Sequence, residues 1–384
     1  MPEKPYSVRP EVLDFAPYDP GLSIDEIRGR YKLDRVIKLA SNENPLGVSP
    51  GVREAVERAS GLVFRYAQSG TPALVKAIAA HHGVDPATVV VGNGSDEVID
   101  LLIRCRATPG KHNAVANKPC FFIYSTQTRL CGVELRQASL REDFSFDWPA
   151  LQALLDDNTA LVFITAPDNP SGYCPAPADL ASFARTLPEG ALLVLDAAYM
   201  DFAEEEAEFS LLLEKLPNVA VLRTFSKSFG LAGLRLGYGI MPAPLAACLC
   251  NVRLPFSVNI LAEAAGLAAL EDTAFRQATF AAVRSGRERL FAGLSALGCF
   301  VHASQANFLL FRLPDKSGEK ASQNQGLGSK TLNQAESVFE ALLKRGVIIR
   351  RLKSYDLPQY FRVSVGNAEE NEIFLDALER ILEA

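Results

Sequence analysis

The sequence predicts an α/β protein with a large domain, built on a mostly parallel sheet flanked by helices, and a smaller α+β domain. Short apolar runs recur, each followed by polar or glycine-rich turn residues and then by helical spacing, as in strands buried on both faces. The pattern changes near residue 260, and 384 residues suffice for two domains. We expect an arm over 1–38 that associates with the small domain, a large domain over 39–260 and a small domain over 261–384.

Composition excludes several classes of partner. The net charge is −6, from 39 Lys and Arg against 45 Asp and Glu, which gives no general attraction to nucleic acid or to an anionic membrane. The 7 cysteines are scattered, without a CxxC pair or histidines at metal spacing, which favours a reducing, cytoplasmic setting and no metal. No apolar signal core begins the sequence, and no run reaches the length of a membrane-spanning helix.

The first predicted strand that is followed by candidate binding residues is 88–91. Gly94, Ser95 and Asp96 come soon after it. Apolar residues at helical spacing follow, so a helix is predicted to begin near Ser95. A strand, glycines and a helix N-terminus together direct free backbone N–H groups at an anion. The alternative is that Ser95 or Asp96 is simply the N-cap of the helix.

Three later predicted strands are also followed by residues whose side chains can react or form hydrogen bonds. They are residues 161–164 before Asn169, 191–195 before Asp196 and Tyr199, and 219–222 before Lys227. Ligands of open α/β sheets bind beyond the carboxyl ends of the strands, so these residues are predicted to converge with Ser95. Taken singly, each has an ordinary alternative, namely a turn residue, a helix cap or a surface lysine.

The small domain alternates helices and strands. The sequence predicts a helix that ends at Gly298, strands at 308–311, 347–349 and 361–365, a helix that ends at Gly346, and a last helix that begins near Asn367. Residues 314–334 are rich in Gly, Ser, Lys and Gln and are predicted to form a polar loop.

The converging residues match the needs of pyridoxal 5'-phosphate. Its aldehyde needs a lysine amine, and Lys227 stands among small residues that leave room for a cofactor. Its ring nitrogen stays protonated beside a carboxylate such as Asp196, and its phosphate needs N–H groups, hydroxyls and an arginine. The sequence contains no P-loop, no dinucleotide-binding GxGxxG after the first strand and no GxSxG elbow.

At this point the sequence resembles a known family. Residues 224–233, TFSKSFGLAG, are similar to the lysine signature of the class II pyridoxal-phosphate aminotransferases. Further motifs follow the family's order: SNENP at 41–45, GSDE at 94–97, NPSG at 169–172, DAAY at 196–199 and FRVSVG at 361–366. The resemblance spans roughly residues 10–384 and implies an aspartate-aminotransferase-like fold of type I.

The resemblance also implies roles for single residues. Lys227 is expected to bond the cofactor aldehyde and to move the proton, Asp196 to pair with the ring nitrogen, and Tyr199 to bond the phenolic oxygen. The expected cofactor-binding residues are Gly94, Ser95, Asp96, Phe121, Asn169, Asp196, Tyr199, Ser226, Lys227 and Arg235, and Tyr66 from a neighbouring subunit. The chain is therefore expected to form a homodimer.

Substrate contacts are expected from the arm, the 41–45 loop and the small domain. The resemblance assigns Arg362 to the substrate carboxylate as a bidentate partner. The anionic group at the far end of the substrate needs a second arginine. Arg350 is predicted for this role, because it follows the strand predicted at 347–349 and a strand end in the small domain would point into the cleft. The remaining expected contacts are Tyr18, Asn42 and Asn169. The alternative for Arg350 is a solvated basic pair with Arg351.

The sequence departs from the family pattern at Ala197, where Glu is common, at Asp168, where Asn is common, and in the long loop 314–334. None of these changes removes a catalytic residue. The leading hypothesis is amino transfer between a phosphorylated amino alcohol and 2-oxoglutarate. The alternatives are decarboxylation of an amino-acid phosphate such as threonine phosphate, transamination of aromatic amino acids, and a non-catalytic protein that only binds a ligand.

Overall fold

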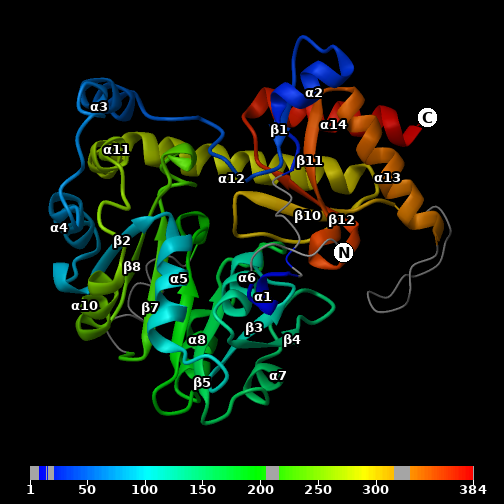
Figure 1. The fold of residues 1–384 in the computed structure, drawn as a ribbon. Coiled ribbons are helices and arrows are strands. Elements are labelled where there is room, and N and C mark those ends of the chain that lie inside the picture. Colours follow the sequence, from blue (N-terminus) through cyan, green and yellow to red (C-terminus); the bar gives the residue numbers. More distant parts are fainter. Residues whose placement is uncertain (1–7, 14, 16–20, 205–215, 315–328, 384) are drawn as a thin grey trace.

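The computed structural model describes residues 8–13, 15, 21–204, 216–314 and 329–383. These residues form a seven-stranded and a five-stranded sheet with helices packed against both (Figure 1). The predicted α/β class is confirmed. The domain boundaries after residues 38 and 260 stay predictions.

The large sheet has the strand order β2-β8-β7-β6-β5-β3-β4. Its strands are β2 (Val89–Asn93), β3 (Asn113–Lys118), β4 (Glu134–Ser139), β5 (Thr159–Thr165), β6 (Leu192–Asp196), β7 (Val219–Thr224) and β8 (Leu236–Ile240). β3 to β7 pair in parallel, whereas β8 is antiparallel to both β2 and β7. The sheet is thus mostly parallel, as predicted.

Helices bury both faces of this sheet, which explains its continuous apolar runs. In β5, Leu161 and Phe163 pack into one core with α5 (Ser95–Arg106) and α6 (Phe122–Leu130). Val162 and Ile164 point to the other face and pack with α8 (Pro177–Ala184). The remaining helices of this part are α3 (Pro50–Ser60), α4 (Pro72–His82), α7 (Trp148–Gln152), α10 (Ala243–Val252) and α11 (Ile260–Glu271), with short 3₁₀ turns η1 (Pro86–Thr88), η2 (Met200–Phe202) and η3 (Ala232–Leu234).

The small sheet has the order β1-β11-β12-β10-β9. Its strands are β1 (Ile37–Leu39), β9 (Phe300–Val301), β10 (Phe308–Arg312), β11 (Val347–Leu352) and β12 (Leu357–Ser364), with a 3₁₀ turn η4 (Lys353–Tyr355) between the last two. β1 pairs in parallel with β11, so a segment near the N-terminus completes a sheet made otherwise from the last part of the chain.

Helices α12 (Thr273–Ala296), α13 (Ser329–Lys344) and α14 (Ala368–Glu383) supply the core of the small sheet. In Figure 1, α12 runs from beside α11 across to the small sheet, so it links the two parts. The first helices are α1 (Pro10–Leu13), which contacts α6, and α2 (Ile24–Tyr31), which contacts α13. Within the described ranges, no helix combines the length and the apolarity that crossing a membrane requires.

Candidate active site

The polar ends of the parallel strands meet at one cavity, as the sequence predicted. The cavity has a volume of about 200 Å³ and lies beyond the ends of β5, β6 and β7 and the start of α5. Its lining residues are Ser95, Asp96, Phe121, Thr165, Asn169, Asp196, Ala198, Tyr199, Thr224, Ser226, Lys227, Ala232 and Arg235. Nine of the eleven residues expected to bind the cofactor line it. The other two are Gly94, which directly precedes the lining residue Ser95, and Tyr66.

Lys227 enters the cavity from the turn after β7. Its Nζ donates a hydrogen bond to the carbonyl oxygen of Ser41 at 3.1 Å. Burial lowers the pKa of its amine to about 8, with a further contribution from the positive charge of Arg362. The turn needs a glycine at 230, because its φ is +73° and a Cβ there would collide with the carbonyl of Gly47. The result is an amine that loses its proton more readily than a surface lysine does.

Asp196 ends β6 and is 3 % exposed. Its Oδ2 accepts a hydrogen bond from the Tyr124 hydroxyl at 2.7 Å, and its Oδ1 accepts one from the Ala198 N–H at 3.2 Å. Burial nevertheless raises the pKa of the carboxyl to about 6, because these donors offset only part of the desolvation. A cationic N–H placed in the cavity would supply the missing partner.

Tyr124 is a member of the site that the sequence interpretation missed. Its ring stacks on Phe163 with 4.6 Å between centroids, and its hydroxyl also lies 2.8 Å from the Thr165 Oγ1. Thr165 pairs with Asp196 across the parallel strands β5 and β6. No strand-end pattern marks Tyr124, since it lies in α6 and reaches Asp196 only through tertiary packing.

Tyr199 lies on the next turn and is 6 % exposed. Its hydroxyl oxygen accepts a hydrogen bond from Asn42 Nδ2 at 3.0 Å, and the Lys227 Nζ is 5.6 Å from the ring centroid. Asn42 is fixed in turn by Ser364, whose Oγ accepts from its backbone N–H at 2.8 Å. The predicted substrate residue Asn42 therefore contacts a predicted catalytic residue.

The start of α5 offers free N–H groups at the other end of the cavity. Gly94, with φ +77°, occupies the N-cap position, and no side chain caps the helix there. The alternative that Ser95 or Asp96 is the N-cap is therefore wrong. A Cβ at Gly94 would lie 2.6 Å from Arg235 Nη2, so the absence of a side chain lets the guanidinium approach. This geometry suits an anion.

Arg235 completes this end of the cavity. Its φ is +55°, and its Nη2 lies 3.1 Å from the Asp96 Oδ2, while its Nη1 lies 3.5 Å from the Ser226 Oγ. The carboxylate of Asp96 is thus turned to Arg235 and holds this cation beside the helix N-terminus. Backbone N–H groups, a serine hydroxyl and an arginine converge here, which is the donor set that a phosphate monoester needs.

Arg362 and Asn169 contact each other directly. The Arg362 Nη1 donates to Asn169 Oδ1, and its Nη2 donates to the carbonyl oxygen of Ala40 at 3.1 Å. Arg362 is 7 % exposed, and its Nε is buried with no hydrogen-bond partner among the described residues. A buried guanidinium with an unmet donor is suited to an incoming carboxylate.

Arg350 does not stand at the end of a strand, so this part of the prediction is wrong. β11 continues through Leu352 because it keeps pairing with β12. Arg350 pairs directly with Arg362 in that register, which places both side chains on one face of the sheet. A Cβ added at Gly21 would lie 2.7 Å from Arg350 Nη1, so the arm approaches this arginine.

Two more residues are expected near the site: Tyr18 and Tyr66. Tyr18 lies outside the described residues. Tyr66 is 80 % exposed and stacks on Phe256 with 4.7 Å between ring centroids. Their expected roles stay predictions.

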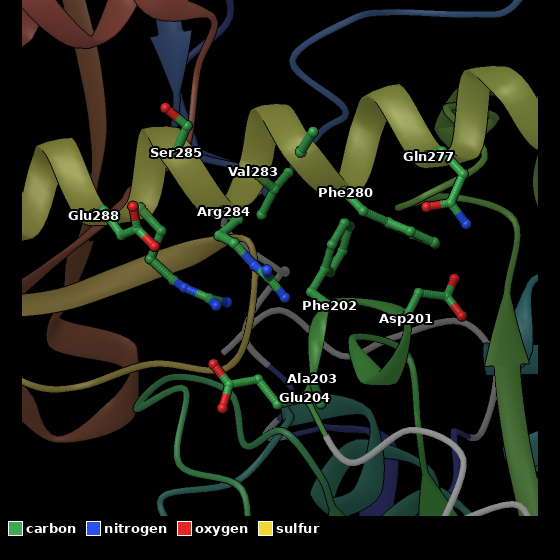
Figure 2. A pocket seen from close by; sticks show the side chains of 12 residues that line it. Asp201, Phe202, Ala203, Glu204, Gln277, Phe280, Val283, Arg284, Ser285 and Glu288 are labelled. Carbon is green, nitrogen blue, oxygen red and sulfur yellow. The ribbon is translucent and has the colours of Figure 1, made fainter.

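A second, larger cavity of about 640 Å³ lies between the segment after β6 and α12 (Figure 2). Asp201, Phe202 and Glu204 line one side, and Gln277, Phe280 and Arg284 of α12 line the other. It contains neither Lys227 nor Asp196, so its size does not make it the reactive centre.

Asp168, a departure from the family pattern, is a buried carboxyl beside the site. It accepts from the Ser171 Oγ at 2.6 Å and the Ser171 N–H at 3.2 Å, and burial raises its pKa to about 6 from 3.8. Between these two values the folded chain binds more protons than the unfolded chain. The free energy of unfolding therefore falls as the pH rises from about 4 to about 6.

Asp168→Asn should remove this contribution, because the amide oxygen still accepts from Ser171 but does not ionise. We expect the cofactor-free variant to be more stable than the wild type above pH 6, by about 2–3 kcal/mol, with no advantage below about pH 4. Urea denaturation across this range measures the difference. Asp143→Asn is the control, since hydrogen bonds from Ser145 lower the pKa of that exposed carboxyl and no gain is expected. An equal gain in both variants would contradict the assignment.

The residues present fit pyridoxal phosphate in three respects. A buried carboxyl without a full set of donors faces the cavity, an uncapped helix N-terminus with Arg235 lies at one end, and an amine with a lowered pKa lies between them. These features match a protonated ring nitrogen, a phosphate and an aldehyde. The fit rests on the donor chemistry of this chain alone.

Comparisons with known proteins agree with this site. Residues 34–378 match the family described as aminotransferase class I and II. The chain is 61 % identical over 381 residues to a protein of Nitratidesulfovibrio vulgaris named histidinol-phosphate aminotransferase, covering 99 % of this chain and 97 % of that one. It is 55 % identical to a protein of the same name from Oleidesulfovibrio alaskensis, covering 100 % and 97 %.

A solved structure is also similar over its full length. The histidinol-phosphate aminotransferase of Sinorhizobium meliloti in complex with pyridoxal-5'-phosphate has a TM-score of 0.86 and 25 % identity, with 98 % of this chain and 97 % of that chain covered. The arrangement of the two sheets is therefore shared with a pyridoxal-phosphate protein.

Proposed function

This chain belongs to the class I and II aminotransferase family, and we propose that it transfers the amino group between L-histidinol phosphate and 2-oxoglutarate. The products are imidazole-acetol phosphate and L-glutamate, and the reaction belongs to histidine biosynthesis. The observation that carries the proposal is 61 % identity over nearly the whole of both chains to a protein named for this activity. The site supports it, because Lys227, Asp196 and Arg235 line one cavity.

Pyridoxal phosphate, when bound, supplies an aldehyde that takes up the amino group and a ring that withdraws electrons from the carbon bearing it. Lys227 is positioned to take a proton from that carbon and to return it elsewhere, since its amine has a lowered pKa. The Asp196 carboxylate keeps a ring N–H protonated, and Tyr124 and the Ala198 N–H hold that carboxylate in place. Tyr199 donates its hydroxyl proton toward the phenolic oxygen while Asn42 supports it.

The phosphate of the cofactor is assigned to the N-terminus of α5. Backbone N–H groups at Ser95 and Asp96, the Ser226 hydroxyl and Arg235 form its cradle. Phe121 lines the same cavity and provides an apolar face for the ring. Asn169 is assigned to the phenolic oxygen through its amide N–H₂, because its Oδ1 is occupied by Arg362.

The two ends of the substrate are assigned to the two arginines that pair across β11 and β12. Arg362 binds the α-carboxylate of glutamate, and its buried Nε supports this role. Arg350 binds the distal anion, which is the phosphate of histidinol phosphate or the second carboxylate of glutamate. Tyr18 is assigned to the same end.

The homodimer is also part of the proposal. An apolar patch, defined here as Leu62, Val63, Phe64, Tyr66, Leu254 and Phe256, consists of side chains that are 45–80 % exposed. Tyr66 stacks on Phe256, so the segments 62–66 and 254–256 meet at this contact. Exposed apolar patches mark protein interfaces. A second copy of the chain would cover the patch, and Tyr66 would then reach the cofactor phosphate of that copy.

We place the protein in the cytoplasm. All 7 cysteines carry free thiols in the structure, and none pairs with another. Thiols persist where glutathione and thioredoxin keep the compartment reducing.

Arg350→Ala should weaken binding of both substrates at the distal anion. We expect KM for histidinol phosphate and for glutamate to rise by the equivalent of roughly 1.5–3 kcal/mol of lost charged hydrogen bonding. Unphosphorylated histidinol should be affected far less. The matched control is Arg351→Ala, since Arg351 faces the other side of β11 and pairs with Glu336. Equal effects on histidinol and histidinol phosphate would show that Arg350 does not bind the phosphate.

A panel of amino donors with 2-oxoglutarate tests the function itself. Histidinol phosphate should give glutamate at a higher kcat/KM than aromatic amino acids or unphosphorylated histidinol. Threonine phosphate should release no carbon dioxide. A chain that binds these compounds but turns none of them over would contradict the proposal and favour a ligand-binding protein.

A further inference from the structure

The segment that carries Tyr199 has a cavity on each side. Ala198 and Tyr199 line the cavity of about 200 Å³ that contains Lys227, whereas Asp201 to Glu204 line the cavity of about 640 Å³ under α12 (Figure 2). Tyr199 and Phe202 of this segment pack with Val283 and Phe308, and Met200 packs in a core of the large sheet. Hydrogen bonds add to this packing and fix the segment relative to its neighbours.

Asp201 provides those hydrogen bonds. Its Oδ1 accepts from Arg223 Nη2, and its Oδ2 accepts from the Ser228 Oγ. The side chains of Arg223 and Asp201 are only 9 % and 7 % exposed, so the ion pair is buried. Arg223 lies near the end of β7 and Ser228 follows Lys227 directly. One carboxylate thus ties the turn after β6 to the turn after β7.

The ion pair is anchored further into the large sheet. The Arg223 side chain also hydrogen-bonds Tyr238 of β8, whose hydroxyl lies 2.7 Å from the Nε2 of His82 in α4. Tyr238 is 1 % exposed. Asp201 is therefore connected through Arg223 to β7, β8 and α4 as well as to the turn that carries Ser228.

Ser228 is held from two sides. It is fully buried, its hydroxyl donates to Asp201, and its carbonyl oxygen accepts from Asn44 Nδ2 at 2.8 Å. Asn44 belongs to the same loop as Ser41, which accepts from the amine of Lys227. The residue next to Lys227 is thus fixed relative to both the Tyr199 turn and the 41–44 loop.

We propose that Asp201 is a positioning residue, which sets the distance between the amine of Lys227 and the Asp196–Tyr199 turn by holding Ser228. The proposal rests on the proposed function, since that reaction is the one that needs this distance. The charges that act on the Lys227 amine come from Arg362, Glu43, Arg235 and Asp96. Asp201 is neutralised by Arg223, so it acts through geometry.

Ser228→Ala tests the proposal with the smallest change, because it removes the hydroxyl and keeps the Cβ. Thr159→Val is the control. It removes a buried hydroxyl that donates to Asn113 Oδ1 at 3.0 Å, at the other end of β5 from the site. Both variants are prepared as holoenzymes, and their thermal midpoints are expected to shift by similar amounts.

We expect Ser228→Ala to lower the single-turnover rate with histidinol phosphate about tenfold, with KM within about twofold of the wild type. The circular dichroism of the bound cofactor, measured per cofactor without substrate, should weaken because the attachment point is less fixed. Asp201→Asn should change both readouts in the same direction. Thr159→Val should change neither.

Wild-type values of both readouts in Ser228→Ala, or changes no larger than those of Thr159→Val, would overturn the proposal. The dichroism needs no substrate and decides the question even if the wild type fails to transaminate. In that case the proposed function fails, while the positioning role is judged on the dichroism alone.

Discussion

Lys227→Ala should lower kcat by about 10⁴-fold, because the variant loses both the covalent attachment of the cofactor and the base that moves the proton. The amine of Lys227 is the one that lines the cavity with Asp196 and Tyr199. Borohydride reduction of the wild-type holoenzyme should fix the cofactor to the peptide that contains Lys227, whereas the variant should remain unlabelled. Steady-state kinetics and peptide mapping measure the two effects.

The matched control is Lys111→Ala, which removes an exposed lysine just before β3. It should keep wild-type kinetics and the label on residue 227. A label on Lys38 or Lys111 in the wild type would contradict the assignment. So would a Lys227→Ala variant with the activity of the control.

Asp196→Asn should still bind the cofactor but lose about 10²–10³-fold in kcat, since an amide does not hold the ring nitrogen protonated. Its effect on stability has the opposite sign. Burial raises the pKa of Asp196 to about 6, so the folded chain binds more protons than the unfolded chain between about pH 4 and 6. Above that range the buried carboxyl is ionised, which lowers the free energy of unfolding. The cofactor-free variant should therefore be more stable than the wild type at pH 7.5.

These two readouts distinguish a catalytic carboxylate from a structural cap. Asp156→Asn is the control, because Arg136 and Asn113 lower the pKa of this half-buried carboxyl to about 2, and Asp156 does not line the cavity. That variant should keep its kcat and lose stability above pH 4. If Asp196→Asn instead transaminates at the wild-type rate, Asp196 only ends a strand.

The strand ends of the large sheet could be predicted because their signals are local. An apolar run buried on both faces and a polar residue after it are adjacent in sequence, as at β6 with Asp196 and β7 with Lys227. The parallel arrangement then brings the ends together without further information. The need for a glycine at 237 could not be predicted in this way, because no local pattern marks that residue. A Cβ at Gly237 would collide with the backbone of Ser95 and so block the start of α5.

The features that could not be predicted depend on pairing between distant segments. Tyr124 reaches Asp196 because α6 packs on β5, and Arg350 lies beside Arg362 because of the β11–β12 register. β1 has only 3 residues, and its strand character comes from its partner β11. The Asp201–Arg223 pair likewise joins the turn η2 to the strand β7, and neither segment's sequence indicates the pairing.

The pairing of β1 with β11 also affects how the chain folds during synthesis. The ribosome releases residues 37–39 long before residues 347–352, so β1 has no neighbour while the large sheet assembles. Ile37 and Leu39, which are 4 % and 2 % exposed in the finished protein, stay accessible to water and to chaperones throughout that interval. Closing so long a loop also slows the last step of folding. β1, the strand of this pair that is made first, is thus secured only after residues 347–349 have been made.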